Sequence, residues 1–119
     1  DGRGACDGED AVRLLADLDA GATGTVGSAL RPERVKPIIA AHHAGDETAA
    51  VEGWRQVLPL INHENRQCGL RATKAVMKAG GVIGSDHVRH PLKQLSERTR
   101  ARLLQLTGEL DLVAMSWGK

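Results

Sequence analysis

One short segment, Ala22–Val26, constrains the fold of this chain more than any other part of its sequence. Its residues are small or β-branched and glycines surround it, which is typical of a buried strand that another backbone or a ligand approaches closely. A single strand cannot satisfy its own backbone donors and acceptors, so it needs neighbouring strands. We find no second strand pattern in the 119 residues and therefore expect those neighbours to lie outside them.

Helical periodicity accounts for most of the remaining sequence, because apolar residues recur at steps of three and four. The expected helices run from about Glu9 to Ala20, from Arg31 to Gly45, from Asp46 through Ile61, roughly from Gly69 to Lys78, and from Ser96 through Leu110. Gly21 is a typical C-terminal stop, and Asp46 and Ser96 are typical N-caps. Pro59 should bend or divide the third helix. The stretch from Val82 to Gln94 should be irregular.

A helix, a strand and another helix in succession form a slice of a repeating β/α architecture. We therefore predict an α/β fold with two parts. Residues 1–45 would be the end of a parallel β/α barrel or sheet, and residues 46–119 would form a helical extension. As an isolated chain the protein would be mostly α-helical and would not be a complete domain.

The composition is that of an ordinary globular chain, with 41% hydrophobic and 26% charged residues. No apolar run approaches 18 residues and no charged-then-apolar leader is present, so we expect neither a transmembrane helix nor a signal peptide. The two cysteines, Cys6 and Cys68, lack zinc-site or CxxC spacing, and free thiols in a reducing cytoplasm are the default. We therefore predict a cytoplasmic protein with no membrane partner.

Charge is distributed unevenly, although the net charge is only +1. Residues 66–102 contain nine Lys and Arg and two Asp and Glu. Such a basic region could bind nucleic acid. The charges fall between apolar helical positions, however, so a solvated helix face is the interpretation we favour, and we expect no nucleic-acid partner.

Glycines punctuate the segment that follows the first expected helix, at Gly21, Gly24 and Gly27, and Ser28 comes next. Glycines in a strand-to-helix turn let a ligand reach the backbone, and the next helix offers free N–H groups to an anion. A tight turn without a ligand fits equally well, because the P-loop lysine and the Gly-x-Gly-x-x-Gly pattern are both missing.

Neither metal chemistry nor covalent chemistry has an obvious residue in this chain. The five histidines lack the spacing that places two ligands on one helical face, so we predict no metal site. A Schiff-base lysine needs a desolvated pocket, and the lysines lie in polar surroundings or at the end of the chain: Lys36, Lys74, Lys78, Lys93 and Lys119. The chain also has no tyrosine. We therefore assign no catalytic residue to it.

Several motifs occur in an order and spacing that resemble one enzyme family. They are Asp7-Gly8-Glu9-Asp10, Gly21-Ala22-Thr23-Gly24-Thr25-Val26-Gly27-Ser28, Leu58-Pro59-Leu60-Ile61, Glu64-Asn65-Arg66-Gln67, Lys74-Ala75-Val76-Met77-Lys78 and Arg89-His90-Pro91-Leu92. Over about residues 7–112 the chain resembles the dihydrodipicolinate synthase / N-acetylneuraminate lyase family. Residues 65–71 are most similar to the branch that dehydrates 2-keto-3-deoxy sugar acids such as 2-keto-3-deoxyarabonate.

The resemblance implies a class I aldolase-like (β/α)₈ TIM barrel with a C-terminal helical bundle, of which this chain would supply about units seven and eight and the bundle. Family members form a Schiff base between a lysine of the sixth strand and the 2-keto group, while a tyrosine of an earlier strand moves protons. We expect no metal or organic cofactor. Because the chain lacks both residues, we expect a C-terminal fragment of a lyase or dehydratase that is inactive alone.

The resemblance also implies substrate contacts at C-terminal ends of strands, where such barrels build their sites. Gly27 and Ser28 match a Gly-Ser that touches the hydroxylated part of the substrate, with turn-capping as the alternative for Ser28. Glu9 and Asp10 match a substrate-binding loop more loosely, and helix capping is an equal alternative for them. The expected partners are a small 2-keto acid and further copies of the chain, as in a homo-oligomer.

A different hypothesis, without catalysis, stays open from the residues alone. The helices from Arg31 onward could fold as a structural or interaction module that presents apolar faces and self-associates.

Overall fold

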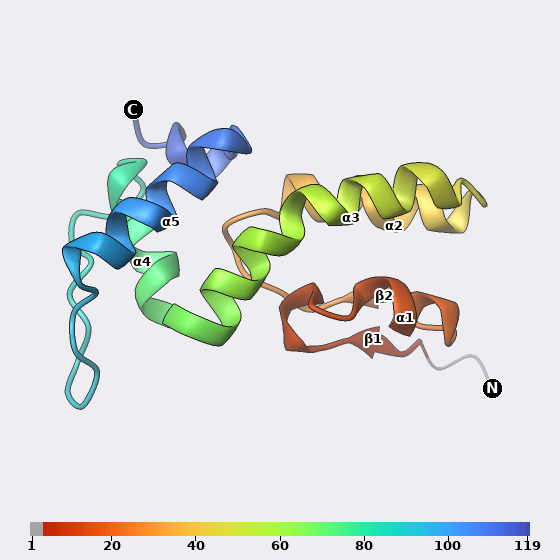
Figure 1. Cartoon of the computed structure of the whole chain (residues 1–119), viewed down its shortest axis with the longest axis horizontal. Helices are drawn as coiled ribbons and strands as arrows, with labels where there is room; N and C mark the ends of the chain where they lie inside the picture. The colour runs from red at the N-terminus through yellow and green to blue at the C-terminus, as the bar shows by residue number, and fades with distance from the viewer. Residues whose placement is uncertain (1–3) are drawn as a thin grey trace.

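The computed structural model describes residues 4–119, which form a mostly helical chain with a small two-stranded parallel sheet (Figure 1). The strands are β1 (Cys6–Asp7) and β2 (Gly24–Thr25). The helices are α1 (Leu14–Asp19), α2 (Pro32–His43), α3 (Glu47–Asn62), α4 (Leu70–Ala79) and α5 (Glu97–Glu109), with the short 3-10 turns η1 (Glu9–Ala11) and η3 (Val113–Met115) and the π-helix η2 (His63–Cys68). No helix in the described part of the chain is both long and apolar enough to cross a membrane.

The sheet overturns our expectation that the chain contains no strand to pair with Ala22–Val26. β1 pairs with β2 in parallel, with Cys6 opposite Gly24 and Asp7 opposite Thr25. The ladder continues at one end, where the Thr23 N–H donates to Ala5 O at 2.7 Å. A strand of two residues is too short to show an alternating pattern, which is why the sequence did not reveal β1. Within residues 4–119 each strand has a partner on one side only.

The burial of the strand segment also differs from the prediction. Gly24 and Thr25 are half-buried, and the side chain that follows them, Val26, is 69% exposed. The segment is therefore only partly covered within residues 4–119, although it has the composition of a buried strand.

The first predicted helix is shorter than expected, because residues 9–11 do not form its first turn. Glu9, Asp10 and Ala11 have φ angles of 49°, 63° and 69°, so three successive residues that are not glycine adopt the left-handed conformation. A right-handed helix cannot include them, and α1 begins only at Leu14. Gly21, with φ of 100°, follows the end of α1 as predicted.

Helices α2 and α3 form an antiparallel hairpin whose ends the sequence predicted well. Pro32 lies in the first turn of α2, and the Asp46 carboxylate caps α3 by accepting from the Ala49 N–H at 3.1 Å. Pro59 does not divide α3, which continues to Asn62 and passes directly into η2. Pro59 and Arg55 are both exposed, so the helical hydrogen bond to the Arg55 carbonyl that proline removes is lost on an exposed part of α3.

Two buried apolar clusters hold the chain together. One lies between α1 and the α2–α3 hairpin, and its largest members are Leu14, Leu18, Ile38, Val57 and Ile61. The other joins α4 and α5 to the end of α3 and to the C-terminal tail, and its largest members are Leu30, Leu60, Val76, Leu103 and Leu112. The tail runs across the end of α4, where the Gly118 N–H donates to Gly80 O at 3.0 Å.

The irregular segment between α4 and α5 extends away from the helices (Figure 1). Arg71 and Lys74 of α4 donate to its backbone carbonyls, and the Asp86 carboxylate adds two ion pairs. Asp86 accepts from Lys78 Nζ at 3.0 Å and pairs with the Arg100 guanidinium. These two cations lower the pKa of Asp86 to about 2. A carboxyl group whose pKa is depressed in the folded state stabilises that state above its ordinary pKa, and the contribution is lost as the pH falls through the depressed value.

We therefore expect Asp86→Asn to lower the free energy of unfolding by about 1 kcal/mol at pH 7, since the two ion pairs are partly exposed. The difference between wild type and variant should shrink as the pH falls from about 4 to about 2. Urea unfolding of both proteins across this pH range measures the difference in their free energies of unfolding. Asp111→Asn is the matched control, because Asp111 has no ion-pair partner among residues 4–119. A constant difference down to pH 2 would contradict the assignment.

Candidate functional site

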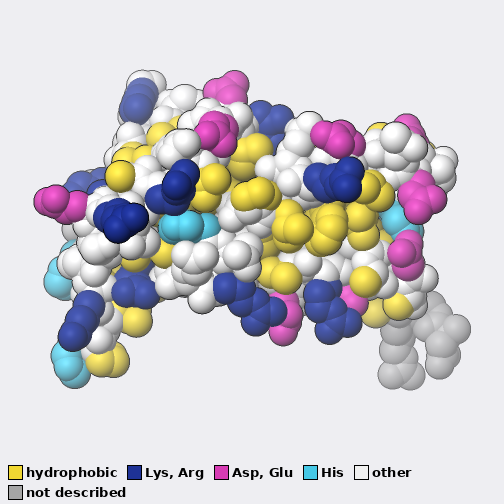
Figure 2. Space-filling view, in the orientation of Figure 1, with side chains coloured by type: hydrophobic (Ala, Val, Ile, Leu, Met, Phe, Trp, Pro, Cys, Tyr) yellow, Lys and Arg dark blue, Asp and Glu magenta, His cyan; other side chains and the backbone are white. Residues whose placement is uncertain are grey.

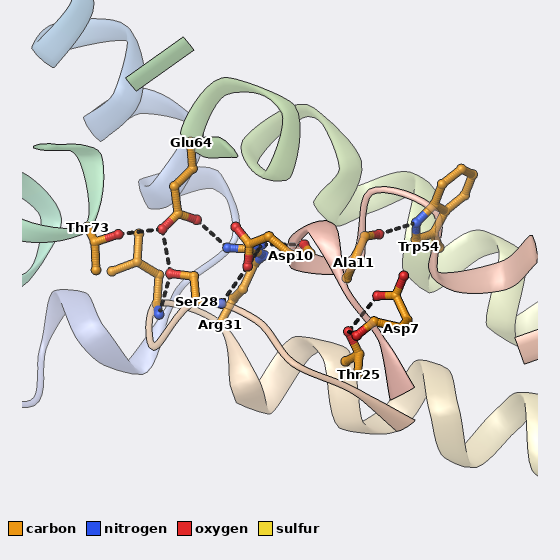
Figure 3. Close-up of polar contacts among 10 residues, drawn as sticks. Asp7, Asp10, Ala11, Thr25, Ser28, Arg31, Trp54, Glu64 and Thr73 are labelled. Atoms are coloured by element: carbon orange, nitrogen blue, oxygen red, sulfur yellow. Dashed lines mark hydrogen bonds and ion pairs between the residues drawn. The ribbon is translucent and has the colours of Figure 1, made fainter. Parts of the chain in front are cut away.

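A polar cluster lies where the two strands end. Asp10 follows β1 by three residues, and Ser28 follows β2 by three residues. Because parallel strands end at the same edge of a sheet, the two residues meet there. The Ser28 N–H donates to Asp10 Oδ1 (Figure 3).

Arg31, just before α2, forms the centre of the cluster and is 1% exposed. Its Nη2 lies 2.9 Å from Asp10 Oδ1 and donates to Asp10 O at the same distance. Its Nη1 pairs with Glu64 Oε2, and Glu64 is 2% exposed. A buried guanidinium and two carboxylates therefore connect the loop after β1, the start of α2 and the π-helix η2. Removing one member of such a group leaves a buried charge without compensation.

The other carboxylate oxygen of Glu64, Oε1, accepts hydrogen bonds from two hydroxyl groups. Ser28 Oγ donates to Glu64 Oε1, and Thr73 Oγ1 of α4 donates to the same oxygen at 2.6 Å. Ser28 Oγ also accepts from the Leu30 N–H at 3.2 Å. Figure 3 shows the Glu64 carboxylate between Thr73, Ser28 and Arg31. We call these five residues, Asp10, Ser28, Arg31, Glu64 and Thr73, the acidic cluster.

Two cavities border the acidic cluster. One, of about 400 Å³, is lined by Ser28, Glu64 and Thr73 together with the exposed apolar side chains Val26 and Leu70. The other, of about 230 Å³, lies between β2 and α2 and is lined on its polar side by Asp10, Ser28 and Arg31. Ser28 therefore borders both spaces.

Asp7, at the end of β1, is a buried carboxyl group outside the acidic cluster. It is 2% exposed, and its Oδ2 accepts from Thr25 Oγ1 at 2.6 Å. Burial raises the pKa of Asp7, and the nearby Asp17 carboxylate raises it further. Asp7 therefore retains a proton to higher pH than an exposed aspartate does.

Three of the four predicted site residues come together in the structure. Gly27, Ser28 and Asp10 lie side by side, and a Cβ at Gly27 would be 3.0 Å from Asp10 Oδ1. Glu9 points elsewhere, and its carboxylate pairs with Arg66 at 3.0 Å on the surface. Neither Glu9 nor Asp10 caps a helix with its side chain, so helix capping is not observed for these two residues. Ser28 does cap the turn, because its Oγ accepts from the Leu30 N–H at 3.2 Å.

Arg31, Glu64 and Thr73 were not predicted from the sequence. Arg31 was noticed only as the start of an expected helix, and Glu64 only as part of a motif shared with a family. A charged residue gives no sign of burial until its partners are known, and those partners are 33 residues apart. No group of three or more potential metal-ligating side chains occurs in the part of the chain that the structure describes.

Comparison with known proteins identifies the family to which this arrangement belongs. A family model described as the dihydrodipicolinate synthetase family matches residues 5–109. The chain belongs to the dihydrodipicolinate synthetase family. This confirms the resemblance that the sequence motifs indicated.

The relatives of this family member include an enzyme of the predicted branch. The L-2-keto-3-deoxyarabonate dehydratase of Azospirillum brasilense is 46% identical over 114 residues, which cover 96% of this chain and 37% of that protein. The structure of dihydrodipicolinate synthase from Rhodopseudomonas palustris matches 88% of this chain and 35% of its own, with a TM-score of 0.81 and 25% identity. The synthase from Bacillus clausii matches 88% of this chain and 37% of its own, with a TM-score of 0.69 and 18% identity. This chain thus spans little more than a third of the length of these relatives.

Proposed function

We propose that this chain is the C-terminal part of a lyase or dehydratase that acts on 2-keto acids of the 2-keto-3-deoxy sugar acid class. The observation that carries the proposal is the 46% identity to a dehydratase of that class over almost the whole chain. The position of the acidic cluster supports it, because enzymes built on parallel strands place their sites at the carboxyl ends of those strands.

In the whole enzyme, residues 1–45 would form units seven and eight of a (β/α)₈ barrel, and residues 46–119 would form the helical extension. The sheet supports this division, since β1 and β2 each have one partner within residues 4–119 and so have edges that further strands can pair with. Val26 and Cys6 are exposed at this sheet and would be covered by those strands. A homo-oligomer would form from such complete subunits.

Within that enzyme the chain would bind substrate rather than carry out the covalent step. The lysine that forms the Schiff base and the tyrosine that moves protons would come from residues outside this chain. Gly27 and Ser28 would contact the hydroxylated part of the substrate. The Asp10 carboxylate would orient Ser28 by accepting from the Ser28 backbone N–H. Glu9 would lie outside this contact, in its surface ion pair with Arg66.

A structural or interaction module without catalysis is the second candidate, and exposed apolar side chains favour it. Trp117 is 76% exposed and Leu70 is 59% exposed. On the face drawn in Figure 2, hydrophobic side chains gather across the middle and charged side chains lie mostly around them. Sedimentation separates the candidates further: a module of this kind predicts a defined oligomer of the 119-residue chain, whereas an enzyme fragment predicts no defined stoichiometry.

Borohydride trapping tests the proposed enzyme. A lysine amine and a 2-keto group form an imine with loss of water, and hydride reduces the imine to a stable amine that mass spectrometry detects. We expect no adduct when the 119-residue chain is treated with pyruvate and borohydride, because none of its five lysines lies in a desolvated pocket. An adduct on any of them would contradict the proposal.

A chimaera supplies the positive arm of this test. This chain replaces the matching 37% of the Azospirillum brasilense dehydratase. The remaining part of that protein would supply the catalytic residues. We expect the chimaera to be trapped by pyruvate and to consume L-2-keto-3-deoxyarabonate. A chimaera that folds, as judged by circular dichroism, but neither traps pyruvate nor consumes that substrate would overturn the proposed function.

A further inference from the structure

We infer that Glu64 is a positioning residue that fixes the direction of the Ser28 hydroxyl, so that Ser28 offers a substrate only a hydrogen-bond acceptor. The inference rests on the proposed function, because it concerns the same substrate site. The inference also predicts substrate specificity. The substrate group that contacts Ser28 Oγ must be a hydrogen-bond donor, such as the hydroxyl of a sugar acid. A keto or ether oxygen at that place would be disfavoured.

The hydrogen bonds of Ser28 can be counted completely. A serine hydroxyl has one proton to donate and two lone pairs that accept. The proton goes to Glu64 Oε1, and the Leu30 N–H occupies one lone pair at 3.2 Å. The Ser28 backbone N–H is also committed, since it donates to Asp10 Oδ1. One lone pair of Oγ therefore remains, and it can only accept.

The hydrogen-bond partners of Glu64 enforce this direction. Its Oε2 receives the guanidinium of Arg31, which has no acceptor and keeps its charge. Its Oε1 receives the hydroxyls of both Ser28 and Thr73. A carboxylate paired with a cation and facing two hydroxyl donors acts only as an acceptor. Glu64 is 2% exposed, so little of its side chain faces water.

Ser28 has space beside it for a ligand. Ser28, Glu64 and Thr73 line the cavity of about 400 Å³, and Val26 and Leu70 provide its apolar wall. This volume lies within the range of small-molecule sites. A short chain of carbons with a hydroxyl group fits such a mixture of one polar edge and one apolar wall.

Glu64→Gln should reverse the direction of the hydrogen bond between residue 64 and Ser28 Oγ, with little change in the shape of the side chain. Arg31 would keep the Asp10 carboxylate at 2.9 Å and would take the Gln oxygen, so the Gln NH₂ group would face Ser28. That NH₂ group donates to Ser28 Oγ, and the hydroxyl proton of Ser28 becomes available to the substrate. Ser28 then offers a donor where the wild type offers an acceptor.

Three 2-keto acids test, in the chimaera, whether Ser28 offers the substrate only a hydrogen-bond acceptor. L-2-keto-3-deoxyarabonate has hydroxyls in its tail, 2,5-dioxohexanoate has a ketone that can only accept, and pyruvate has no tail. The measured quantity is the concentration of each that gives half-maximal borohydride trapping. In the wild-type chimaera we expect the half-maximal concentration of 2,5-dioxohexanoate to be about three to ten times that of L-2-keto-3-deoxyarabonate. One hydrogen bond accounts for a difference of this size.

Glu64→Gln should lower the half-maximal concentration of 2,5-dioxohexanoate by about three- to tenfold and leave that of pyruvate within about twofold. Ser28→Ala should remove the preference between the two longer acids, and Glu64→Gln should then have no further effect on their ratio. Glu52→Gln is the matched control, because Glu52 is exposed on α3 and its carboxylate accepts a hydrogen bond from Gln56. We expect it to change none of the three values.

Each other result counts against the inference. A wild-type chimaera that binds both longer acids equally well overturns it without any variant, so it stays testable even if Glu64→Gln does not fold. A variant that weakens all three acids alike shows a purely structural role for Glu64. A chimaera that traps none of them overturns the proposed function itself, and the inference with it.

Discussion

Arg31→Met is expected to lower the free energy of unfolding of this chain by about 3 to 5 kcal/mol, the cost of breaking a buried ion pair from one side. The variant would leave Glu64, at 2% exposure, without its cation, and Asp10 would lose two contacts at 2.9 Å. Such a loss is a large fraction of the roughly 5 to 15 kcal/mol that typically separates folded and unfolded states. Urea unfolding followed by circular dichroism measures it.

The matched variant is Arg31→Met combined with Glu64→Leu, which removes both charges and fills their space with apolar atoms. Replacing a buried ion pair in this way is often close to neutral. We therefore expect the double variant to recover most of the stability that the single variant loses. If the two variants are equally unstable, the packing of the Arg31 side chain matters and its charge does not.

Gly80→Ala is expected to destabilise the chain by at least about 3 kcal/mol, the upper end of the usual cost of overpacking. A Cβ at Gly80 would overlap the carbonyl oxygen of Ala114 in the C-terminal tail. Because the overlapping atoms belong to the backbone, the tail would have to move, and the bond from the Gly118 N–H to Gly80 O would break. A lower midpoint of thermal unfolding would report the destabilisation.

Gly108→Ala is the control for this substitution. Gly108 lies in α5, is exposed, and has no neighbouring atom within 4 Å of the place where a Cβ would lie. Alanine there should raise stability by up to about 1 kcal/mol, because glycine is the poorer helix former. If Gly80→Ala were as harmless as Gly108→Ala, the tail would not pack against the end of α4.

The sequence predicted the helical part of this fold because each helix carries its own local signals. Pro32, Asp46 and Ser96 mark starts that the structure confirms, and the Ser96 hydroxyl accepts from the Thr99 N–H at 3.2 Å. Such caps depend on residues three apart, which a single sequence displays directly.

The sheet and the acidic cluster were only partly predictable, because they depend on residues far apart in the chain. β1 consists of Cys6 and Asp7, too few residues for a pattern, and it becomes a strand only by pairing with residues 24 and 25. Gly27, Ser28 and Asp10 were found through motifs that resemble a family. Arg31 and Glu64 were missed because mutual burial, which a sequence does not display, is what makes them important.

The left-handed turn at Glu9, Asp10 and Ala11 has a consequence for the order in which this region forms. Each such residue costs about 1 to 2 kcal/mol relative to an ordinary backbone conformation. The compensating contacts come from much later in the chain: Arg31 holds Asp10, the Trp54 indole donates to Ala11 O at 3.2 Å, and Arg66 holds Glu9. We therefore expect the turn to become stable during synthesis only after α3 and η2 have left the ribosome.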